Sequence, residues 1–498
     1  MACPVQKLPD KIIGRVQEQR ILHQILKSKK AEFLALYGRK GTGKTFLIKS
    51  FFNRDSCIFF HVTGKHDDTM VDHLKKFTEQ IGNTFYGGIS LLTQKSWLET
   101  FGILTKAMQD RVESKQKIIL FFDELPWMAT KRSRLLQALE YYWNRYWSYD
   151  PRIKLIICGS SASWIIENII NNQKGFSNRV SQTMKLIPFT LLETKEFLEH
   201  LGISLSERQI LDIYMAIGGI PYYLEKLSKL KRGRSTQQYI SELWLQSNGA
   251  LINEFNLLFA SLFDKSDIYI GFIRKIAKHH LGFSQAELVR RKESRGGGRA
   301  IQRLKHLEEA GFIQSFISQG YRKRGTFYKI IDEYTLSYIH WIEPHLTSIR
   351  QQKQHSHFRA AKCAPPSWKD WADIAFGAVC HKHIEQIQRA LNIDTGAKVG
   401  SWRYSPKHKK QEKEAEFDQL FDRTDDFTTL CEIKYSDKPL MISKDYALQL
   451  ERKKSIYREQ TKTKKHIFLA IITPCGLKES KYSNRVIDQE AILDDLFT

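Results

Sequence analysis

Eight consecutive residues near the start of the chain have the types and spacing that bind a triphosphate. The run from Gly38 to Thr45 reads GRKGTGKT and fits the pattern G-x-x-x-x-G-K-[ST]. Its glycines let backbone N–H groups surround phosphate oxygens, and a following helix adds the positive end of its dipole. We therefore expect ATP here, with Lys44 on the β- and γ-phosphates and the Thr45 hydroxyl on Mg²⁺. The predicted nucleotide contacts in and just after this run are Gly38, Arg39, Gly41, Thr42, Gly43, Lys44, Thr45 and Phe46.

A pair of acidic residues follows a second apolar run. Residues 118–122 are apolar without a break, which is typical of a strand buried on both faces of a parallel sheet. Asp123 and Glu124 come directly after it. We expect Asp123 to hold Mg²⁺ through water and Glu124 to act as the general base on the attacking water. Next to the phosphate loop, this interpretation outweighs a merely solvated acidic turn.

Two more residues are candidates for contact with the γ-phosphate. Ser160 follows the apolar run 154–158, where either a γ-phosphate contact or a helix cap explains a serine. Arg179 is either an arginine finger, acting on its own or on a neighbouring subunit, or an ordinary surface arginine.

An aromatic segment, EYYWNRYWSY at 140–149, predicts a helix. Its tyrosines and tryptophans recur at spacing four and so share helix faces. Packing of an amphipathic helix is the commoner explanation, and base stacking or a subunit interface is the alternative.

Two β-like runs near the C-terminus carry a second set of chemical groups. Residues 414–421 contain Asp418, and 428–436 contain Glu432 and Lys434, which alternation puts on one face of a strand. Two carboxylates converging from adjacent strands are ligands for Mg²⁺, and Lys434 would orient water or stabilise charge on a phosphodiester. The alternative is an exposed strand edge with alternating charges. Basic runs at 407–413 and 462–465 either grip phosphates or form a solvated face.

The elements that must position these residues divide the chain into five parts. Residues 1–190 alternate strands (33–37, 57–62, 118–122, 154–158) with helices (near 43–53, 66–82, 93–113, 132–147), which predicts an α/β fold with a parallel sheet. Helices alone follow, then a short helical region ending in a hairpin, a polar linker and a last α/β unit. The predicted parts are a P-loop core at 1–190, a helical lid at 191–262, a winged helix at 263–345, a linker at 346–369 and an α/β domain at 370–498.

Bulk composition restricts the partners. The 498 residues carry 78 basic and 54 acidic side chains, a net charge of +24, which favours a polyanionic partner and DNA in particular. The seven cysteines form no CxxC pair or Cys/His cluster, which favours a reducing compartment. We see no apolar stretch long enough to span a bilayer and no signal-peptide core, so we expect no membrane contact and a cytoplasmic location.

The ordered motifs resemble those of an ATPase family abundant in archaea, within the STAND branch of AAA+-related NTPases. They include Gly14-Arg15, the phosphate loop, FDELPW at 122–127, CGSSASW at 158–164 and Gly219-Ile220-Pro221. The resemblance covers about residues 1–345. It implies that Gly14 and Arg15 border the adenine, that Pro221 lies near the base, and that the chain is a nucleotide-controlled switch, with a homo-oligomer and a protein trigger as possible partners.

The segment 368–497 is similar to the nuclease-like domain of the PD-(D/E)xK type that is fused to this family. The match lies in W-x-x-W at 368–371, LCEIK at 430–434 and LDDLF at 493–497. The resemblance implies a restriction-endonuclease-like fold. The family's first helix commonly reads A-F-E, whereas this chain has Gly377 in the third position, which puts cleavage in doubt. Glu385, two helical turns on, is a substitute to be tested.

Three functions follow as alternatives. The first is an ATP-binding and ATP-hydrolysing switch whose C-terminal region binds and cleaves DNA. The second is a nucleotide-gated regulatory protein that binds DNA and has an inactive nuclease fold. The third is an ATPase that remodels proteins. Metal-dependent cleavage separates the first two, and the salt dependence of DNA affinity separates both from the third.

Overall fold

The chain divides into two compact units, residues 1–188 and 189–498. The computed structural model describes residues 11–52, 57–130, 132–172, 175–176, 178–230, 236–244, 249, 251–278, 282–290, 297–317, 325–351, 367–404 and 414–498. The basic run 407–413 and most of the predicted linker lie outside these residues. The linker prediction was too long at its start, because 346–351 form a helix, α17 (Leu346–Gln351).

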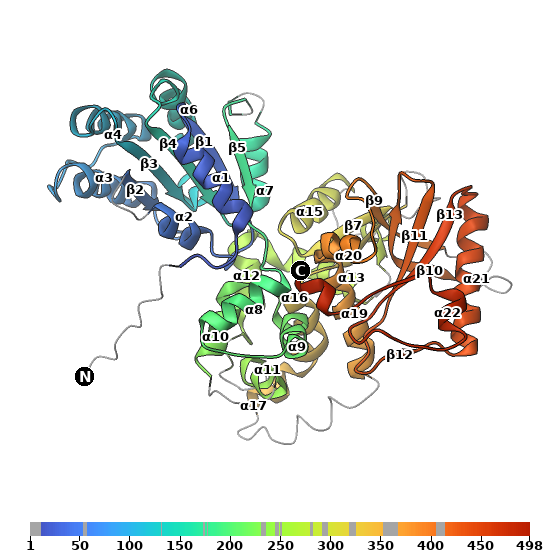
Figure 1. Cartoon of the computed structure of the whole chain (residues 1–498). Helices are drawn as coiled ribbons and strands as arrows, with labels where there is room; N and C mark the ends of the chain where they lie inside the picture. The colour runs from blue at the N-terminus through green and yellow to red at the C-terminus, as the bar shows by residue number, and fades with distance from the viewer. Residues whose placement is uncertain are drawn as a thin grey trace. The chain divides into compact units, whose positions relative to one another are not determined.

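The first unit is built on a five-stranded sheet in the order β2-β3-β4-β1-β5, with every pair parallel (Figure 1). All four predicted strands are present, and the sheet gains a fifth at its edge. The strands are β1 (Glu32–Tyr37), β2 (Cys57–Thr63), β3 (Lys117–Asp123), β4 (Ile153–Gly159) and β5 (Gln182–Lys185).

Helices cover both faces of this sheet because its central strands are apolar on both sides. In β1, Phe33 and Ala35 pack into one core cluster while Leu34 and Leu36 pack into another. The first cluster includes α3 (Met70–Phe85), α4 (Trp97–Arg111) and α6 (Leu135–Arg145), and the second includes α1 (Val16–Lys27) and α2 (Lys44–Phe52).

In the second unit, one apolar core runs from Phe189 to Phe497. It takes in α8 (Leu191–His200), α9 (Glu207–Ile217), α10 (Pro221–Ser228), α12 (Glu254–Leu262) and α16 (Glu333–Ser337). The segments that the sequence divides into lid, hairpin region and last domain therefore share a core. Patterning cannot show this, because it reports which face of an element is apolar but not which element covers it.

A small three-stranded sheet lies within this unit, in the order β6-β8-β7 with antiparallel pairs. Its chain order is helix, strand, two helices and a hairpin. The elements are α13 (Ser266–Ala277), β6 (Phe283–Ser284), α14 (Gln285–Arg290), α15 (Gly297–Glu309), β7 (Ile313–Ile317) and β8 (Thr326–Ile330).

The C-terminal part has a mixed five-stranded sheet in the order β15-β13-β11-β10-β9. One face packs against α19 (Ser367–Lys382) and α20 (Ile384–Ala390), the other against α21 (Lys444–Thr461). The predicted single helix 371–392 is therefore two helices, which break at His383. The strands are β9 (Lys398–Tyr404), β10 (Ala415–Asp422), β11 (Phe427–Ile433), β13 (His466–Ile472) and β15 (Gln489–Ala491).

Candidate functional site

The loop between β1 and α2 has a backbone that favours glycine at three positions. Gly38, Gly41 and Gly43 have φ angles of 151°, 87° and 90°. At Gly38 a Cβ atom would lie 2.3 Å from the carbonyl oxygen of Leu186, so a side chain there is excluded by backbone. The loop therefore presents its main chain rather than side chains, as a phosphate cradle requires.

Lys44 begins α2 and lies within the loop. Its Nζ donates to the carbonyl oxygens of Gly38 (2.9 Å) and Arg39 (3.0 Å) and to the Ser160 hydroxyl (3.1 Å). The side chain is buried, as are those of Arg39 and Thr42. The Thr42 hydroxyl donates to the Arg39 carbonyl at 2.8 Å, which closes the loop on itself.

Thr45 and Asp123 lie side by side where β1 and β3 end. The Thr45 hydroxyl donates to Oδ2 of Asp123 at 2.7 Å, and the Glu124 N–H donates to Oδ1 at 3.1 Å. Burial alone would raise the pKa of Asp123, but hydrogen bonds from His61 and Thr45 outweigh it and lower the pKa. The carboxylate is thus ionised beside a hydroxyl, and this oxygen pair fits the hard-cation preference of Mg²⁺.

Glu124 points toward the end of the neighbouring strand β4. Its Oε2 accepts from the Ser160 N–H at 3.0 Å, and its Oε1 accepts from the Ser160 hydroxyl. The residue has a left-handed φ of 48°, an uncommon conformation for a residue with a side chain. Ser160 therefore joins Glu124 to Lys44 and is not a helix cap. The N-cap of the next short helix is Ser161, and its side chain makes no capping hydrogen bond.

Three of the remaining predicted nucleotide residues lie around this loop. Arg15 is buried, and its guanidinium donates to the Thr42 carbonyl at 3.3 Å. Gly14 precedes it with φ 58°. Phe46 lies in the first turn of α2 and is 42% exposed, so an apolar ring faces solvent near the loop.

Strand direction corrects the prediction for Arg179. Gln182 in β5 pairs with Leu34 in parallel β1, so Arg179 lies beyond the amino end of the sheet, whereas the phosphate loop follows its carboxyl end. Arg179 is exposed there. A finger role within the same subunit is therefore wrong, while a role toward a neighbouring subunit stays a prediction. Pro221 begins α10 in the second unit.

The aromatic segment 140–149 separates into two kinds of residue. Trp143 and Trp147 are buried in the core, at 4% and 1% exposed. Tyr141 and Tyr146 are 44% and 40% exposed. The tryptophans therefore serve packing, and α6 ends at Arg145, short of the predicted helix.

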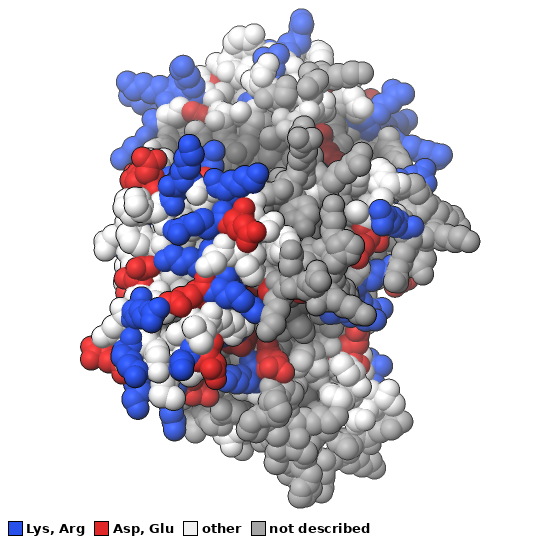
Figure 2. Space-filling model, turned by 90° about the vertical axis from the view of Figure 1, so that its right-hand side faces the viewer, with Lys and Arg blue, Asp and Glu red and all other residues white. Residues whose placement is uncertain are grey.

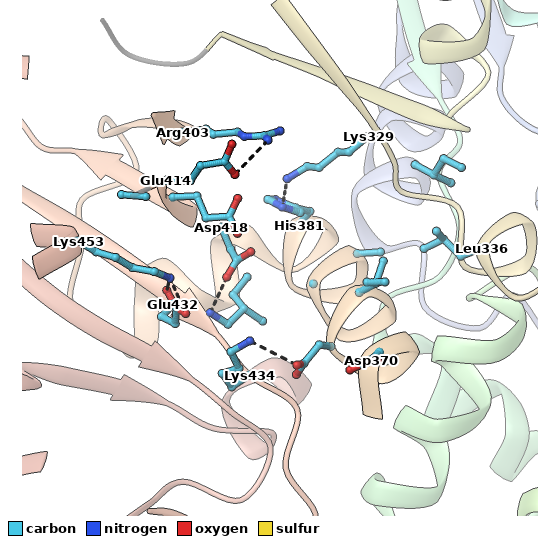
Figure 3. Close-up of a pocket in the computed structure, with 18 of the residues that line it drawn as sticks. Lys329, Leu336, Asp370, His381, Arg403, Glu414, Asp418, Glu432, Lys434 and Lys453 are labelled. Atoms are coloured by element: carbon cyan, nitrogen blue, oxygen red, sulfur yellow. Dashed lines mark hydrogen bonds and ion pairs between the residues drawn. The ribbon is translucent and has the colours of Figure 1, made fainter. Parts of the chain in front are cut away.

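In the second unit, the three predicted C-terminal residues line one pocket of about 590 Å³ (Figure 3). Because β10 and β11 pair with Gln419 opposite Cys431, Asp418 lies opposite Glu432. Asp418 Oδ2 accepts from the Ile433 N–H at 3.0 Å.

Two residues that sequence reasoning missed hold this set in place. Glu432 is buried, and both of its carboxylate oxygens accept hydrogen bonds from Nζ of Lys453 on α21, at 2.9 and 2.8 Å. Asp373 on α19 accepts from Lys434 Nζ at 3.4 Å and from the Tyr435 N–H at 2.8 Å. Burial alone would lower the pKa of Lys434, but nearby carboxylates, Asp373 foremost, raise it. The sequence does contain a signal for Asp373, because it lies four residues before Gly377 and therefore on the same face of the helix.

The proposed substitute Glu385 is wrong. It lies in α20, is exposed and does not line the pocket. Gly377 does line the pocket, and a Cβ atom there would meet nothing within 4 Å. Asp373, one helical turn earlier, supplies a carboxylate at this wall instead.

Other carboxylates and cations share the pocket. Burial raises the pKa of Glu416 to about 7, and Asp418 adds to this rise. Burial lowers the pKa of Lys329 to about 8, against the attraction of Asp418. Within the described residues, no three His, Cys, Asp or Glu side chains lie close enough together to hold a metal ion. Glu432, bound through both oxygens to Lys453, is not free to act as the second ligand predicted from the sequence.

Comparison with known proteins agrees with the geometry of the first site. Residues 13–227 match the family described as an ATPase domain predominantly from Archaea. This part of the chain is therefore similar to archaeal ATPase domains. An uncharacterized protein of Methanocaldococcus jannaschii is 26% identical over 351 residues, which are 68% of this chain and 70% of that protein.

Two solved structures are similar over about two thirds of the chain. The Walker-type ATPase of Pyrococcus abyssi has a TM-score of 0.47 and 18% identity, covering 66% of this chain and 96% of that one. The ORC2 protein of Aeropyrum pernix has a TM-score of 0.43 and 15% identity, covering 70% and 96%. In the part of this chain that the structure describes, we find no helix with the length and apolarity to cross a membrane.

Proposed function

We propose that this chain is an ATP-dependent switch that binds Mg–ATP, hydrolyses it and acts on DNA. The observation that carries the proposal is the convergence of Lys44, the Thr45–Asp123 pair and Glu124 at the carboxyl ends of three adjacent strands. When bound, Mg²⁺ would neutralise developing charge on the phosphates, and Thr45 with Asp123 would hold it. Lys44 binds the β- and γ-phosphates after leaving the carbonyl oxygens of its own loop.

Glu124 supplies the base in this scheme. Ser160 holds its carboxylate at the end of β4, next to Lys44. A carboxylate in that place accepts a proton from water aligned with the γ-phosphate, and Ser160 keeps it oriented. Arg15 contributes by fixing the loop through the Thr42 carbonyl. The STAND-like switch and the roles of Gly14 and Pro221 near the adenine remain part of the proposal.

The test compares three variants of the full chain. Lys44→Ala should abolish binding of a fluorescent ATP analogue, and Glu124→Gln should bind it but release phosphate at least about a hundred times more slowly. Lys40→Ala is the matched control, because Lys40 is an exposed lysine of the same loop. Phosphate release by Glu124→Gln at the wild-type rate would refute the assignment of the base.

DNA binding rests on the small sheet with α15. A helix followed by a β-hairpin is the order of a winged helix, and α15 carries exposed Arg299 and Lys305 and a half-buried Arg303. The net positive charge is weaker support for DNA binding, because the face drawn in Figure 2 has acidic side chains among its Lys and Arg. Arg299→Ala and Arg303→Ala should weaken duplex binding and flatten its salt dependence. Affinity that is absent or does not respond to salt would favour an ATPase acting on proteins.

A second function, cleavage of DNA, is favoured by one observation. Asp418, Asp373 and Lys434 meet in a single pocket despite the missing glutamate at position 377. Asp373 would orient water toward a phosphodiester, and Lys434 would stabilise the charge that develops on it. Nicking of plasmid DNA with Mg²⁺ or Mn²⁺ should be lost in Asp418→Ala and Lys434→Ala. If the unsubstituted chain cuts nothing under any metal and nucleotide condition, the nuclease fold is inactive and the chain is a nucleotide-gated DNA-binding protein.

A further inference from the structure

A lysine lies on the inward face of α21, where the helix packs against the sheet. The buried residues of this helix recur at intervals of three and four, and they are Ala447, Leu450, Lys453 and Tyr457. Lys453 is 8% exposed, and its ammonium lies 5.8 Å from the centre of the Phe417 ring. A charged group on a buried helix face costs free energy unless a counter-charge meets it, so the partner of this lysine explains its place.

That partner is Glu432, the residue that the sequence assigns to a divalent ion. Lys453 Nζ donates to both of its carboxylate oxygens, at 2.9 and 2.8 Å, and Glu432 is buried as well. Burial raises the pKa of the Glu432 carboxyl, and the Lys453 ammonium is the strongest influence that opposes this rise. Figure 3 shows the pair at one side of the pocket, with both dashed lines from Lys453 ending on the carboxylate. The charge of Glu432 is therefore balanced by a group of the chain itself.

A divalent ion does not fit this arrangement. Mg²⁺ takes oxygen ligands at about 2.0–2.1 Å, so an ion on either oxygen of Glu432 would lie within about 5 Å of the Lys453 ammonium, which repels it. Asp373 offers no replacement, because one of its oxygens accepts from the Lys434 ammonium and the other from the Tyr435 N–H. The magnesium site predicted from the sequence therefore disagrees with the contacts of a carboxylate that was expected to form it.

We propose that Lys453 replaces the divalent ion of this pocket, and that its ammonium is the resident cation at Glu432. An ammonium bonded to both oxygens neutralises the carboxylate with charge-assisted hydrogen bonds, which is the electrostatic part of what a metal ion does between carboxylates. The chain thus carries this cation permanently, and the pocket is complete without metal. A latent metal site, formed by Glu432 and Asp418, lies beneath the ammonium of Lys453.

Removal of Lys453 should uncover this latent site, and metal binding measures it without any enzymatic activity. All chains carry Asp123→Asn, which removes the carboxylate proposed for Mg²⁺ at the ATP site. Mn²⁺ is titrated into the full chain without nucleotide or DNA, and free Mn²⁺ is followed by electron paramagnetic resonance. The parent chain, which keeps Lys453, should show only the weak binding of scattered surface carboxylates. Lys453→Met should gain one site per chain that binds Mn²⁺ at least about tenfold more tightly.

Two control variants and one reversal isolate the effect of the ammonium. Lys453→Arg keeps a cation at the same place, and Lys454→Met removes the neighbouring lysine of the same helix, so neither should gain the site. Adding Glu432→Gln to Lys453→Met should abolish the site, because it removes the carboxylate that the first change uncovered. Mn²⁺ should also raise the urea midpoint of Lys453→Met, in which it replaces the lost counter-charge, and leave the midpoint of the parent chain unchanged.

Two results would overturn the replacement of the metal ion by Lys453. One is a tight Mn²⁺ site in the parent chain that Asp418→Asn abolishes, and the other is a folded Lys453→Met that gains no site. If circular dichroism shows that Lys453→Met is unfolded, Lys453→Gln takes its place under the same criterion. The inference rests on the contacts of Glu432 and not on DNA cleavage, and the titration contains no DNA. The nuclease proposal can therefore fail in the plasmid assay while the Mn²⁺ titration decides this inference by itself.

Discussion

A buried histidine makes the stability of the second unit depend on pH in a way that can be calculated. His383 lies between α19 and α20 and is fully buried. Its Nε2 accepts from the Leu191 N–H at 2.9 Å, at the start of α8, and its Nδ1 donates to the Val379 carbonyl at 2.8 Å. These partners require a neutral ring with its proton on Nδ1. Protonation of Nε2 would turn two N–H groups toward each other and break the bond to α8.

Burial lowers the pKa of His383 from 6.5 to about 4. Because the folded pKa lies below the unfolded one, the unfolded chain binds more protons between these values. The free energy of unfolding therefore falls as pH drops from 6.5 toward 4. At 1.36 kcal/mol per pKa unit, His383 alone lowers the free energy of unfolding by about 2 kcal/mol between pH 7.5 and pH 5, because the loss begins only below pH 6.5.

The measurement compares wild type with His383→Gln, which keeps a hydrogen-bond acceptor but cannot gain a charge. Urea unfolding at pH 7.5 and pH 5 gives a free energy for each protein. The variant should be less stable at pH 7.5, where the neutral ring packs best, and the gap should shrink by about 2 kcal/mol at pH 5. His466→Gln, at an exposed histidine of the same unit, controls for the loss of any imidazole. A gap that is the same at both pH values would refute the reasoning.

Three further predictions follow from single contacts. Gly38→Ala should abolish binding of the ATP analogue in fluorescence titration, because its Cβ would lie 2.3 Å from the Leu186 carbonyl oxygen; unchanged binding would contradict the loop geometry. Lys453→Met should lower the free energy of unfolding by about 3–5 kcal/mol, because it leaves the buried Glu432 carboxyl without its counter-charge, whereas adding Glu432→Gln should restore most of the loss. Burial raises the pKa of Glu416 to about 7 in the folded chain, above the ordinary value of 4.5, so its ionisation removes stability as pH rises through this range. Glu416→Gln should therefore gain about 2–3 kcal/mol relative to wild type between pH 5 and pH 8 in urea unfolding, and a parallel pH profile would contradict this.

The phosphate loop and its strand are features that the sequence predicts by itself. The loop, the start of α2 and the strand before it span only residues 32–52, and the glycines act through local backbone geometry. Four of the five strands of the first unit were predicted for the same reason, since each is a short apolar run whose composition indicates that it is buried. The place of Asp123 and Glu124 also follows, because parallel strands bring their carboxyl ends to one edge.

Contacts across the chain could not be predicted in this way. Strand order puts β4 between β3 and β1, and only this order joins Ser160 to both Glu124 and Lys44. The same strand direction puts Arg179 at the opposite edge of the sheet. No local sequence pattern predicts the strand order or the position of Arg179 relative to the phosphate loop.

The C-terminal pocket shows most clearly which features the sequence predicts and which depend on tertiary structure. Alternation predicts Glu432 and Lys434 on one strand face, and both residues line the pocket, but β11 ends at Ile433 and the two side chains find their partners on different helices. The carboxylate that meets Lys434 comes from Asp373, 61 positions earlier, and the cation that neutralises Glu432 comes from Lys453 on the other side of the sheet. A sequence determines which groups are available on each face of an element. Only tertiary packing decides which of them meet, because a side chain that enters a low-dielectric core must find its counter-charge wherever the fold brings one.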